Sequence, residues 1–174
     1  LGLLEKGFNV TVIDSNINSS SASIDRIKKI SSNSFSRIEF KKGDIRNDIF
    51  LENIFKEFLK KGSEIKAVIH LAGLKSVKES IKKPMDYWDN NVLGSLSLFR
   101  TMIKFKCFNI IFSSSATVYG NPKSIPIFED DEKNPINTYG ETKLTIEKIL
   151  RDLHSVNNFN VILLRYFNPI GAHY

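Results

Sequence analysis

The sequence is poor in cysteine and histidine and contains no long apolar run. Cys107 is the only cysteine in 174 residues, so the chain cannot form an internal disulfide. We expect a buried thiol in a reducing compartment, the cytoplasm. No stretch approaches the roughly eighteen apolar residues that a membrane span needs. His70 lies in an apolar run and is predicted to be a core histidine, and no Cys/His cluster indicates a metal site.

The charge balance is positive. Lysines and arginines number 25 against 19 acidic residues, a formal net charge of +6. Such an excess favours an anionic partner. The lysines are dispersed along the chain, however, so we expect no nucleic-acid or membrane role. The length is that of one domain with a sizeable core.

Strand-like and helix-like segments alternate five times. Strands are predicted at 8–14, 37–44, 65–73, 108–115 and 159–168, and helices at 23–30, 47–62, about 75–105 with an interruption at Pro84, and 138–156. The strands are apolar on both faces, which is typical of a parallel sheet covered by helices. The sequence therefore predicts an α/β fold with a doubly wound parallel sheet. Ligands of such folds bind beyond the carboxyl ends of the strands.

Candidate binding residues follow these strands. Asp14 closes the first strand, where a carboxylate accepts hydrogen bonds from the adenosine ribose of a dinucleotide. It would repel a 2′-phosphate, and the next two residues supply no cation, which favours NAD over NADP. Asp44 is a candidate adenine contact, with a plain turn role as the alternative. The small residues of "LAGLK", 71–75, would let backbone approach a ligand closely. Lys75 is either a ribose contact or a solvated lysine.

Two tyrosines have a lysine four positions later, and their contexts differ. Between Tyr119 and Lys123 the sequence reads Gly-Asn-Pro, which interrupts a helix, so the two side chains need not share a side. Tyr139 and Lys143 lie within a predicted helix, where positions four apart share one face. The second pair is therefore the candidate for chemistry.

The second pair predicts an activated phenol. Thr138 and Glu141 form a T-x-x-E capping box that would begin the helix just before Tyr139. The Lys143 ammonium, the positive helix end and a bound oxidised nicotinamide would each lower the pKa of the phenol. A tyrosine titrating near neutrality is a suitable general base for a substrate hydroxyl. Ser115, at the end of a predicted strand, is the candidate third member, although its two preceding serines or a turn role are alternatives.

Several motifs in the right order resemble a known family. "HLAGLKSVKES", "YWDNNVLGSL", "SSSATVYG", "YGETK" and "LLRYFNPIGAH" are similar to the UDP-glucose 4-epimerase (UDP-galactose 4-epimerase) family of the extended short-chain dehydrogenase/reductase superfamily. The resemblance covers the whole chain. It implies a Rossmann-type fold, NAD as cofactor, a UDP-hexose substrate and, at full length, a cytoplasmic homodimer. The implied reaction is epimerisation at C4 through a 4-keto sugar, in galactose metabolism.

The resemblance also implies roles for single residues. Tyr139 matches the catalytic base, Lys143 its partner and Ser115 the catalytic serine. Implied cofactor contacts are Asp14, Asn18, Ser19, Asp44, Ile45, Leu71, Ala72, Gly73, Leu74, Lys75, Asn90, Tyr139, Lys143 and Phe167, and implied substrate contacts are Ser115, Tyr139 and Asn168. Sugar-nucleotide 4,6-dehydratases carry an Asp-Glu pair where this chain has Ala116 and Thr117. Elimination of water therefore lacks its acid and base.

Two features of the family have no match in this sequence. The family opens with a strand and a Gly-rich loop that cradles the pyrophosphate, and it ends with a substrate domain. We therefore expect residues 1–174 to be an incomplete NAD-binding domain, truncated at both ends, with a gap in its sheet. Alone it should bind NAD poorly and not turn over. The alternatives are an epimerase of UDP-glucuronate or UDP-N-acetylhexosamine, and a non-catalytic NAD-binding protein.

Overall fold

Parallel strands alternate with helices along the chain, as predicted. The computed structural model describes residues 1–31 and 37–171. The strands are β1 (Val10–Asp14), β2 (Ile38–Lys42), β3 (Val68–His70), β4 (Asn109–Ser115) and β5 (Asn160–Tyr166). The helices are α1 (Gly2–Glu5), α2 (Ala22–Ile30), α3 (Asp48–Lys60), α4 (Val77–Lys82), α5 (Pro84–Tyr87), the π-helix η2 (Trp88–Leu93), α6 (Gly94–Lys104), the 3-10 helix η3 (Ala116–Tyr119) and α7 (Thr138–Asn157). Within the described ranges, every helix is too short or too polar to cross a bilayer.

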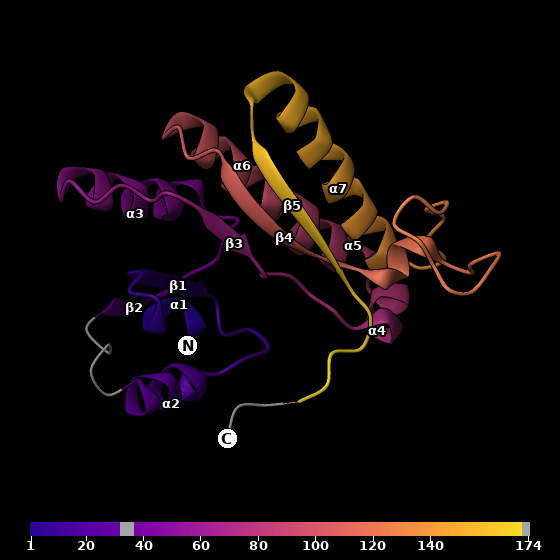
Figure 1. Cartoon of the computed structure of the whole chain (residues 1–174), viewed down its shortest axis with the longest axis horizontal. Helices are drawn as coiled ribbons and strands as arrows, with labels where there is room; N and C mark the ends of the chain where they lie inside the picture. The colour runs from indigo at the N-terminus through magenta and orange to yellow at the C-terminus, as the bar shows by residue number, and fades with distance from the viewer. Residues whose placement is uncertain (32–36, 172–174) are drawn as a thin grey trace.

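The parallel strands form two separate sheets. β1 pairs with β2, and β3, β4 and β5 pair in that order. In Figure 1 the two sheets lie side by side, with β1 nearer than β2 to β3. In the part of the chain that the structure describes, no strand pairs with the facing edges of β1 and β3. The predicted parallel sheet is therefore present in two pieces.

One face of the three-stranded sheet carries the principal core. Helices α6 and α7 run along β4 and β5 in Figure 1. The core includes buried apolar side chains from α3, α6, β4 and α7 and the segments beside them: Leu51, Phe55, Leu98, Phe99, Met102, Cys107, Ile110, Phe112, Ile146, Leu150 and Phe159. Cys107 is thus a buried thiol, as predicted. A smaller core of Leu4, Ile24 and Ile38 packs α1 and α2 against the other sheet.

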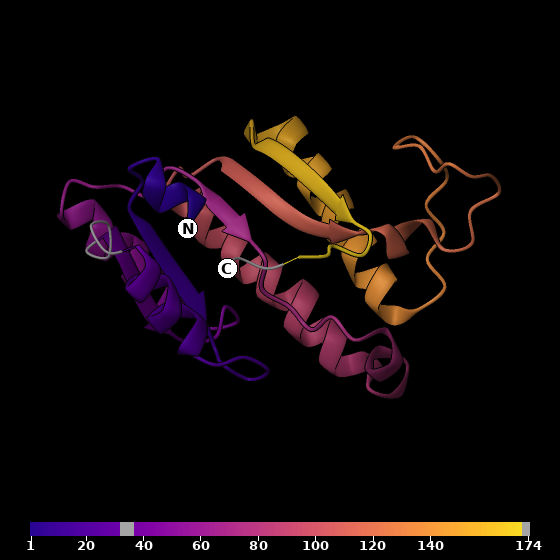
Figure 2. The same ribbon diagram turned by 60° about the horizontal axis from the view of Figure 1, so that its bottom comes forward.

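The opposite face of the three-stranded sheet is exposed. Along β5 exposed and partly buried residues alternate, and Ile162, Leu164 and Tyr166 are 53%, 38% and 43% exposed. Figure 2 shows the same strand from a second direction. The sequence predicted apolar strands covered on both faces. In the described residues only one face is covered, so several apolar side chains meet solvent.

The long helical region after β3 is divided into separate helices at Pro84, as the sequence predicted. Ser76 caps α4 by accepting a hydrogen bond from the Glu79 amide at 3.3 Å. Pro84 begins α5, a position where its missing N–H leaves no intrahelical bond unmade. The chain then continues through the π-helix η2 into α6. π-helical turns are frequent at functional sites, and this one brings Asn91 beneath the loop that follows β3.

Candidate active site

Three predicted catalytic side chains lie together at the carboxyl end of β4. Ser115 is the last residue of β4, and Tyr139 and Lys143 are one turn apart on α7. All three are buried, with 9%, 9% and 4% of their surface exposed. The Lys143 ammonium donates to the Ser113 carbonyl at 2.7 Å and lies 5.8 Å from the Tyr139 ring centroid and 4.8 Å from that of Phe112. The helical spacing therefore brings the amine to the tyrosine ring.

The start of α7 differs from the prediction. Asn137 is the N-cap, and its side chain accepts from the Gly140 amide at 2.8 Å, so the predicted capping box of Thr138 and Glu141 is wrong. Asn and Thr are both good caps, and the actual helix begins at Thr138, one residue earlier than the box required. A Cβ on Gly140 would lie 2.8 Å from the Thr117 carbonyl oxygen. This close approach holds the first turn of α7 against η3.

The pKa of Tyr139 also differs from the prediction, because it is raised where the sequence predicted a lowered value. Burial raises the pKa of the Tyr139 phenol, and hydrogen bonding with the Ser115 hydroxyl offsets this only in part. Burial lowers the pKa of Lys143 to about 8. The groups in the structure therefore favour a neutral phenol, because desolvation outweighs the hydrogen bond.

Ser115 is oriented by a residue that the sequence reasoning overlooked. Its hydroxyl oxygen accepts hydrogen bonds from the Thr117 amide at 3.2 Å and from the Thr117 hydroxyl at 3.0 Å. The Ser115 proton is therefore directed elsewhere, towards Tyr139 or a ligand oxygen. In the sequence, Thr117 was considered only because it stands where 4,6-dehydratases carry an acidic residue.

The other Tyr/Lys pair has a different structure, as predicted. Tyr119 is buried and its hydroxyl accepts from Arg165 at 2.6 Å. Lys123 is exposed and pairs with Glu132 at 2.6 Å. The side chains of Tyr119 and Lys123 therefore have separate partners.

The loop after β1 is organised around Asp14. Its Oδ1 accepts from the Asn16 amide at 2.8 Å and from the Ser19 hydroxyl at 2.9 Å. Asn18 and Ser19 are exposed in the same loop. Asp14 and Ser19 are thus in contact at the carboxyl end of β1, with Asn18 next to Ser19 in the chain, and the cofactor roles of all three stay predictions.

Asp44, after β2, is held by a neighbouring cation. The Arg46 guanidinium donates to both Asp44 oxygens, with distances from 2.6 to 3.1 Å, and also bonds Asp89 of η2. The hydrogen bonds from Arg46 lower the pKa of Asp44. The side chain of Ile45, the next residue, packs against the principal core.

The loop after β3 is clamped by Asn91, which the sequence reasoning did not name. Its Oδ1 accepts from the Leu74 amide at 2.7 Å, and its Nδ2 donates to the Leu74 carbonyl at 3.0 Å and to the Thr142 hydroxyl at 3.1 Å. A Cβ on Gly73 would lie 2.9 Å from that Oδ1. Asn90, the predicted residue, instead donates to a carbonyl one turn earlier at 2.7 Å. Adjacent asparagines look alike in sequence, and only their burial separates them.

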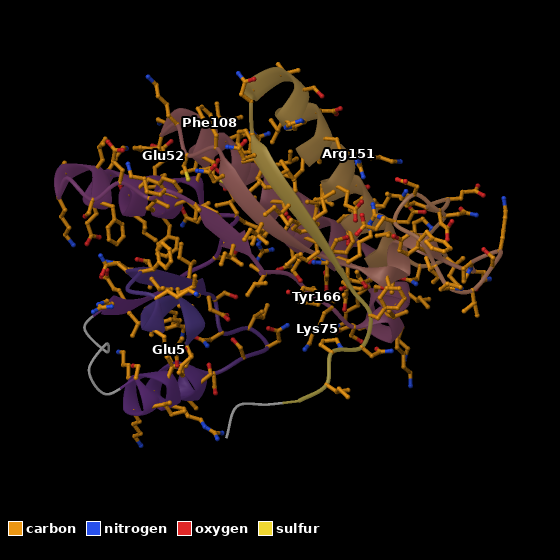
Figure 3. All side chains as sticks on the ribbon, in the orientation of Figure 1. Glu5, Glu52, Lys75, Phe108, Arg151 and Tyr166 are labelled. Carbon is orange, nitrogen blue, oxygen red and sulfur yellow. The ribbon has the colours of Figure 1, made fainter. Side chains whose placement is uncertain are left out.

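The remaining predicted residues lie at the carboxyl ends of β3 and β5. Figure 3 shows Lys75 and Tyr166 towards this end of the three-stranded sheet. Leu71 and Phe167 are 65% and 61% exposed, and Asn168 is also exposed. Ala72 is half-buried between Leu71 and the clamped glycine. These residues follow the strand ends in the chain, and their binding roles stay predictions.

A parallel α/β fold with a serine, a tyrosine and a lysine together at a strand end agrees with the extended short-chain dehydrogenase/reductase class that the motifs resemble. The model of the family described as GDP-mannose 4,6 dehydratase matches residues 1–174. The chain belongs to this family.

Known proteins are similar over the whole of this chain. It is 47% identical over 174 residues to UDP-glucose 4-epimerase 2 of Arabidopsis thaliana, covering 99% of this chain and 48% of that protein. It is 45% identical over 173 residues to the bifunctional UDP-glucose 4-epimerase and UDP-xylose 4-epimerase 1 of Pisum sativum, covering 98% and 48%. The crystal structure of UDP-glucose 4-epimerase from Bifidobacterium longum in complex with NAD+ and UDP superimposes with a TM-score of 0.91 at 43% identity, covering 99% and 50%. The chain spans about half the length of the curated relatives it matches.

Proposed function

We propose that the full-length protein is an NAD-dependent epimerase that inverts C4 of a UDP-hexose and interconverts UDP-galactose and UDP-glucose. The observation that carries the proposal is the buried group of Ser115, Tyr139 and Lys143 at the end of β4. Ala116 and Thr117 follow in η3, where a 4,6-dehydratase would need its acid and base. The names of the similar proteins support epimerisation over elimination, although the family description mentions a dehydratase.

NAD fits the residues present at the strand ends. Within residues 1–31 and 37–171 no protein donor bonds to Asp14 Oδ2, so this oxygen is available to the hydroxyls of an adenosine ribose. Residues 15–20 contain no cation, which disfavours a 2′-phosphate. Gly73 lets the backbone lie close to Asn91, and this loop would line the cofactor. The Bifidobacterium longum structure contains NAD+.

The chain's own residues would handle the proton at the sugar 4-hydroxyl. NAD, when bound, supplies reversible hydride acceptance at C4. Tyr139, as the phenolate, would take the hydroxyl proton at its phenol oxygen and later return it. Ser115, whose oxygen accepts twice from Thr117, would donate a hydrogen bond to the phenolate or to the sugar oxygen and keep its proton. The Lys143 ammonium and the positive nicotinamide would together oppose the desolvation that favours the neutral phenol.

Conversion of UDP-galactose to UDP-glucose by the full-length protein tests the proposal. Changing Tyr139→Phe should lower kcat by about a thousandfold, the scale of a lost general base, and leave NAD bound. Tyr87→Phe is the matched control, because it removes another buried phenol hydroxyl, one that bonds the Ser76 backbone. It should retain turnover. Unchanged turnover in Tyr139→Phe contradicts the mechanism, and loss of NAD together with activity favours a purely NAD-binding protein.

The substrate range and assembly complete the proposal. UDP-glucuronate, UDP-N-acetylglucosamine and UDP-xylose, the last because of the pea relative's name, should react more slowly than UDP-galactose under the same conditions. We propose a cytoplasmic homodimer at full length, with the sheet completed by a strand and Gly-rich loop and the pocket by a substrate domain. The 174-residue chain alone should show no turnover, and appreciable activity would overturn this assignment of an incomplete NAD-binding domain.

A further inference from the structure

A third side chain of α7 continues the line of catalytic residues and contacts the same strand. Glu147 follows Lys143 by one turn and Tyr139 by two, and it is 1% exposed. Its Oε1 accepts from the Ser114 hydroxyl at 2.5 Å. Lys143 bonds the carbonyl of the preceding residue, Ser113. Consecutive residues of β4 are therefore bonded to successive turns of α7.

Glu147 is also paired with a partly buried cation from β5. Arg165 donates through Nε to Glu147 Oε1 at 2.9 Å and through Nη2 to Oε2 at 2.8 Å. Its Nη1 donates to the Tyr119 hydroxyl at 2.6 Å and to the Glu129 carbonyl at 2.8 Å. A single guanidinium thus joins β5 to α7, to η3 and to the loop before α7. A bidentate pair of this kind fixes geometry as well as charge.

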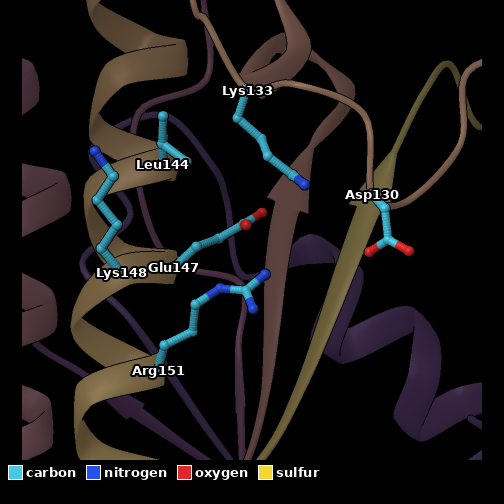
Figure 4. A pocket seen from close by; sticks show the side chains of 6 residues that line it. All are labelled: Asp130, Lys133, Leu144, Glu147, Lys148 and Arg151. Carbon is cyan, nitrogen blue, oxygen red and sulfur yellow. The ribbon is translucent and has the colours of Figure 1, made fainter.

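The pair stays ionised although it is buried. Burial would raise the pKa of Glu147, but the hydrogen bonds from Arg165 and Ser114 and the charges of Arg165 and Arg151 lower it overall. Figure 4 shows Glu147 and Arg151 reaching from α7 over a hollow of about 350 Å³. The hollow is also lined by Asp130, Lys133, Leu144 and Lys148. Three of the lining side chains, Lys133, Lys148 and Arg151, are cationic, so positive charge surrounds the Glu147 carboxylate.

We propose that Glu147 and Arg165 are positioning residues that set the register of α7 along β4 and thereby hold Tyr139 against Ser115. A buried ion pair contributes little net stability but can specify one arrangement over its neighbours. A slip of α7 by one turn would displace the tyrosine by ~5 Å. The hydrogen-bond partners of the pair are Ser114, Tyr119 and the Glu129 carbonyl, none of them a predicted substrate or cofactor residue, so the pair acts through α7 and η3.

The kinetic test rests on the proposed function and uses the full-length protein. Glu147→Met combined with Arg165→Met replaces the pair by apolar side chains, so the thermal midpoint should stay close to the original. The kcat should fall about 10- to 100-fold, the cost of misplacing a reacting group, while KM changes less than about threefold. Glu52→Gln is the matched control, because it removes a surface ion pair between α3 and α6. It should leave both constants unchanged.

A second measurement needs no substrate. The phenolate absorbance of Tyr139, isolated by subtracting the Tyr139→Phe spectrum, should titrate at a different pH in the Glu147→Met/Arg165→Met variant than in the original, because a displaced phenol changes both its burial and its hydrogen bond with Ser115. Two further titratable groups lie near the phenol: Lys143, whose pKa burial lowers to about 8, and His70 of β3, which burial keeps neutral. If the double variant keeps its kcat and the phenol titration is unchanged, the positioning role is overturned. If the original protein shows no turnover, the proposed function fails, and the titration alone decides the role of the pair.

Discussion

The environment of Lys143 depends on a histidine that carries no charge. His70 lies beneath it in the core, with Nε2 2.8 Å from the Ser95 hydroxyl and its ring 5.5 Å from that of Phe112. Burial, and then the charge of Lys143, lower the pKa of His70 to about 3. A neutral imidazole leaves Lys143 as the cation beside Tyr139. The sequence-based interpretation of His70 as a core histidine agrees with this placement.

The pKa of His70 predicts how stability depends on pH. Because the folded pKa lies below the ordinary value of 6.5, stability is present at higher pH and is lost as pH falls from about 6.5 towards 3. The free energy of unfolding should drop by about 2 kcal/mol between pH 7 and pH 5, as denaturant titrations would measure. His70→Gln should remove most of this slope, and the exposed His154→Gln should keep it. An unchanged slope in His70→Gln would contradict the argument.

Single residues were predictable where spacing alone decides their neighbours. Tyr139 and Lys143 are four positions apart on a helix, and that fact suffices to bring them together. Asn91 and Glu147 were not predicted, because their partners lie on segments far away in the sequence. Neither a second asparagine nor an acidic residue in a helix signals burial by itself. The direction of the Tyr139 pKa was also missed, since desolvation depends on how many neighbours cover the ring.

At the scale of elements, helix and strand types were predicted well and their ends less well. The segment 65–73 was expected to be a long strand, but β3 comprises only Val68–His70. Its one described neighbour is β4, and a strand paired on one side has fewer hydrogen bonds to extend it. The start of α7 depends on one side-chain bond, made by Asn137 instead of Thr138.

Two neighbouring substitutions separate the observed cap from the predicted one. Asn137→Ala should lower the free energy of unfolding by about 1 kcal/mol, because the Gly140 amide loses its acceptor. Thr138→Ala should change it by only a few tenths of a kcal/mol. Chemical denaturation of both variants measures the difference. Equal losses of unfolding free energy, or a larger loss in Thr138→Ala, would support the predicted capping box instead.

At the scale of the molecule, a three-stranded sheet with one bare apolar face is the dominant feature. The exposed side chains of β5 continue onto β3, where Ile69 is 44% exposed. Large contiguous apolar patches are uncommon on monomeric proteins. The sequence predicted apolar strands, but no strand pattern reveals which segment covers each face.

The bare face should bind an apolar dye in the 174-residue chain. Ile162→Thr combined with Leu164→Thr should reduce anilinonaphthalene sulfonate fluorescence about twofold, with circular dichroism unchanged. The control pair Ile125→Thr and Val156→Thr removes two exposed apolar side chains elsewhere, 89% and 78% exposed. It should leave the fluorescence as it was. Equal reductions by both pairs would mean that the sheet face is not the dye site.

The solitary thiol gives this protein a built-in reporter. Cys107 is 3% exposed within the principal core, and burial raises the pKa of its thiol. An alkylating reagent can therefore react with it only when α6 and β4 separate. In the 174-residue chain, where Cys107 is the single cysteine, the labelling rate therefore measures how often these two elements separate, without an engineered probe.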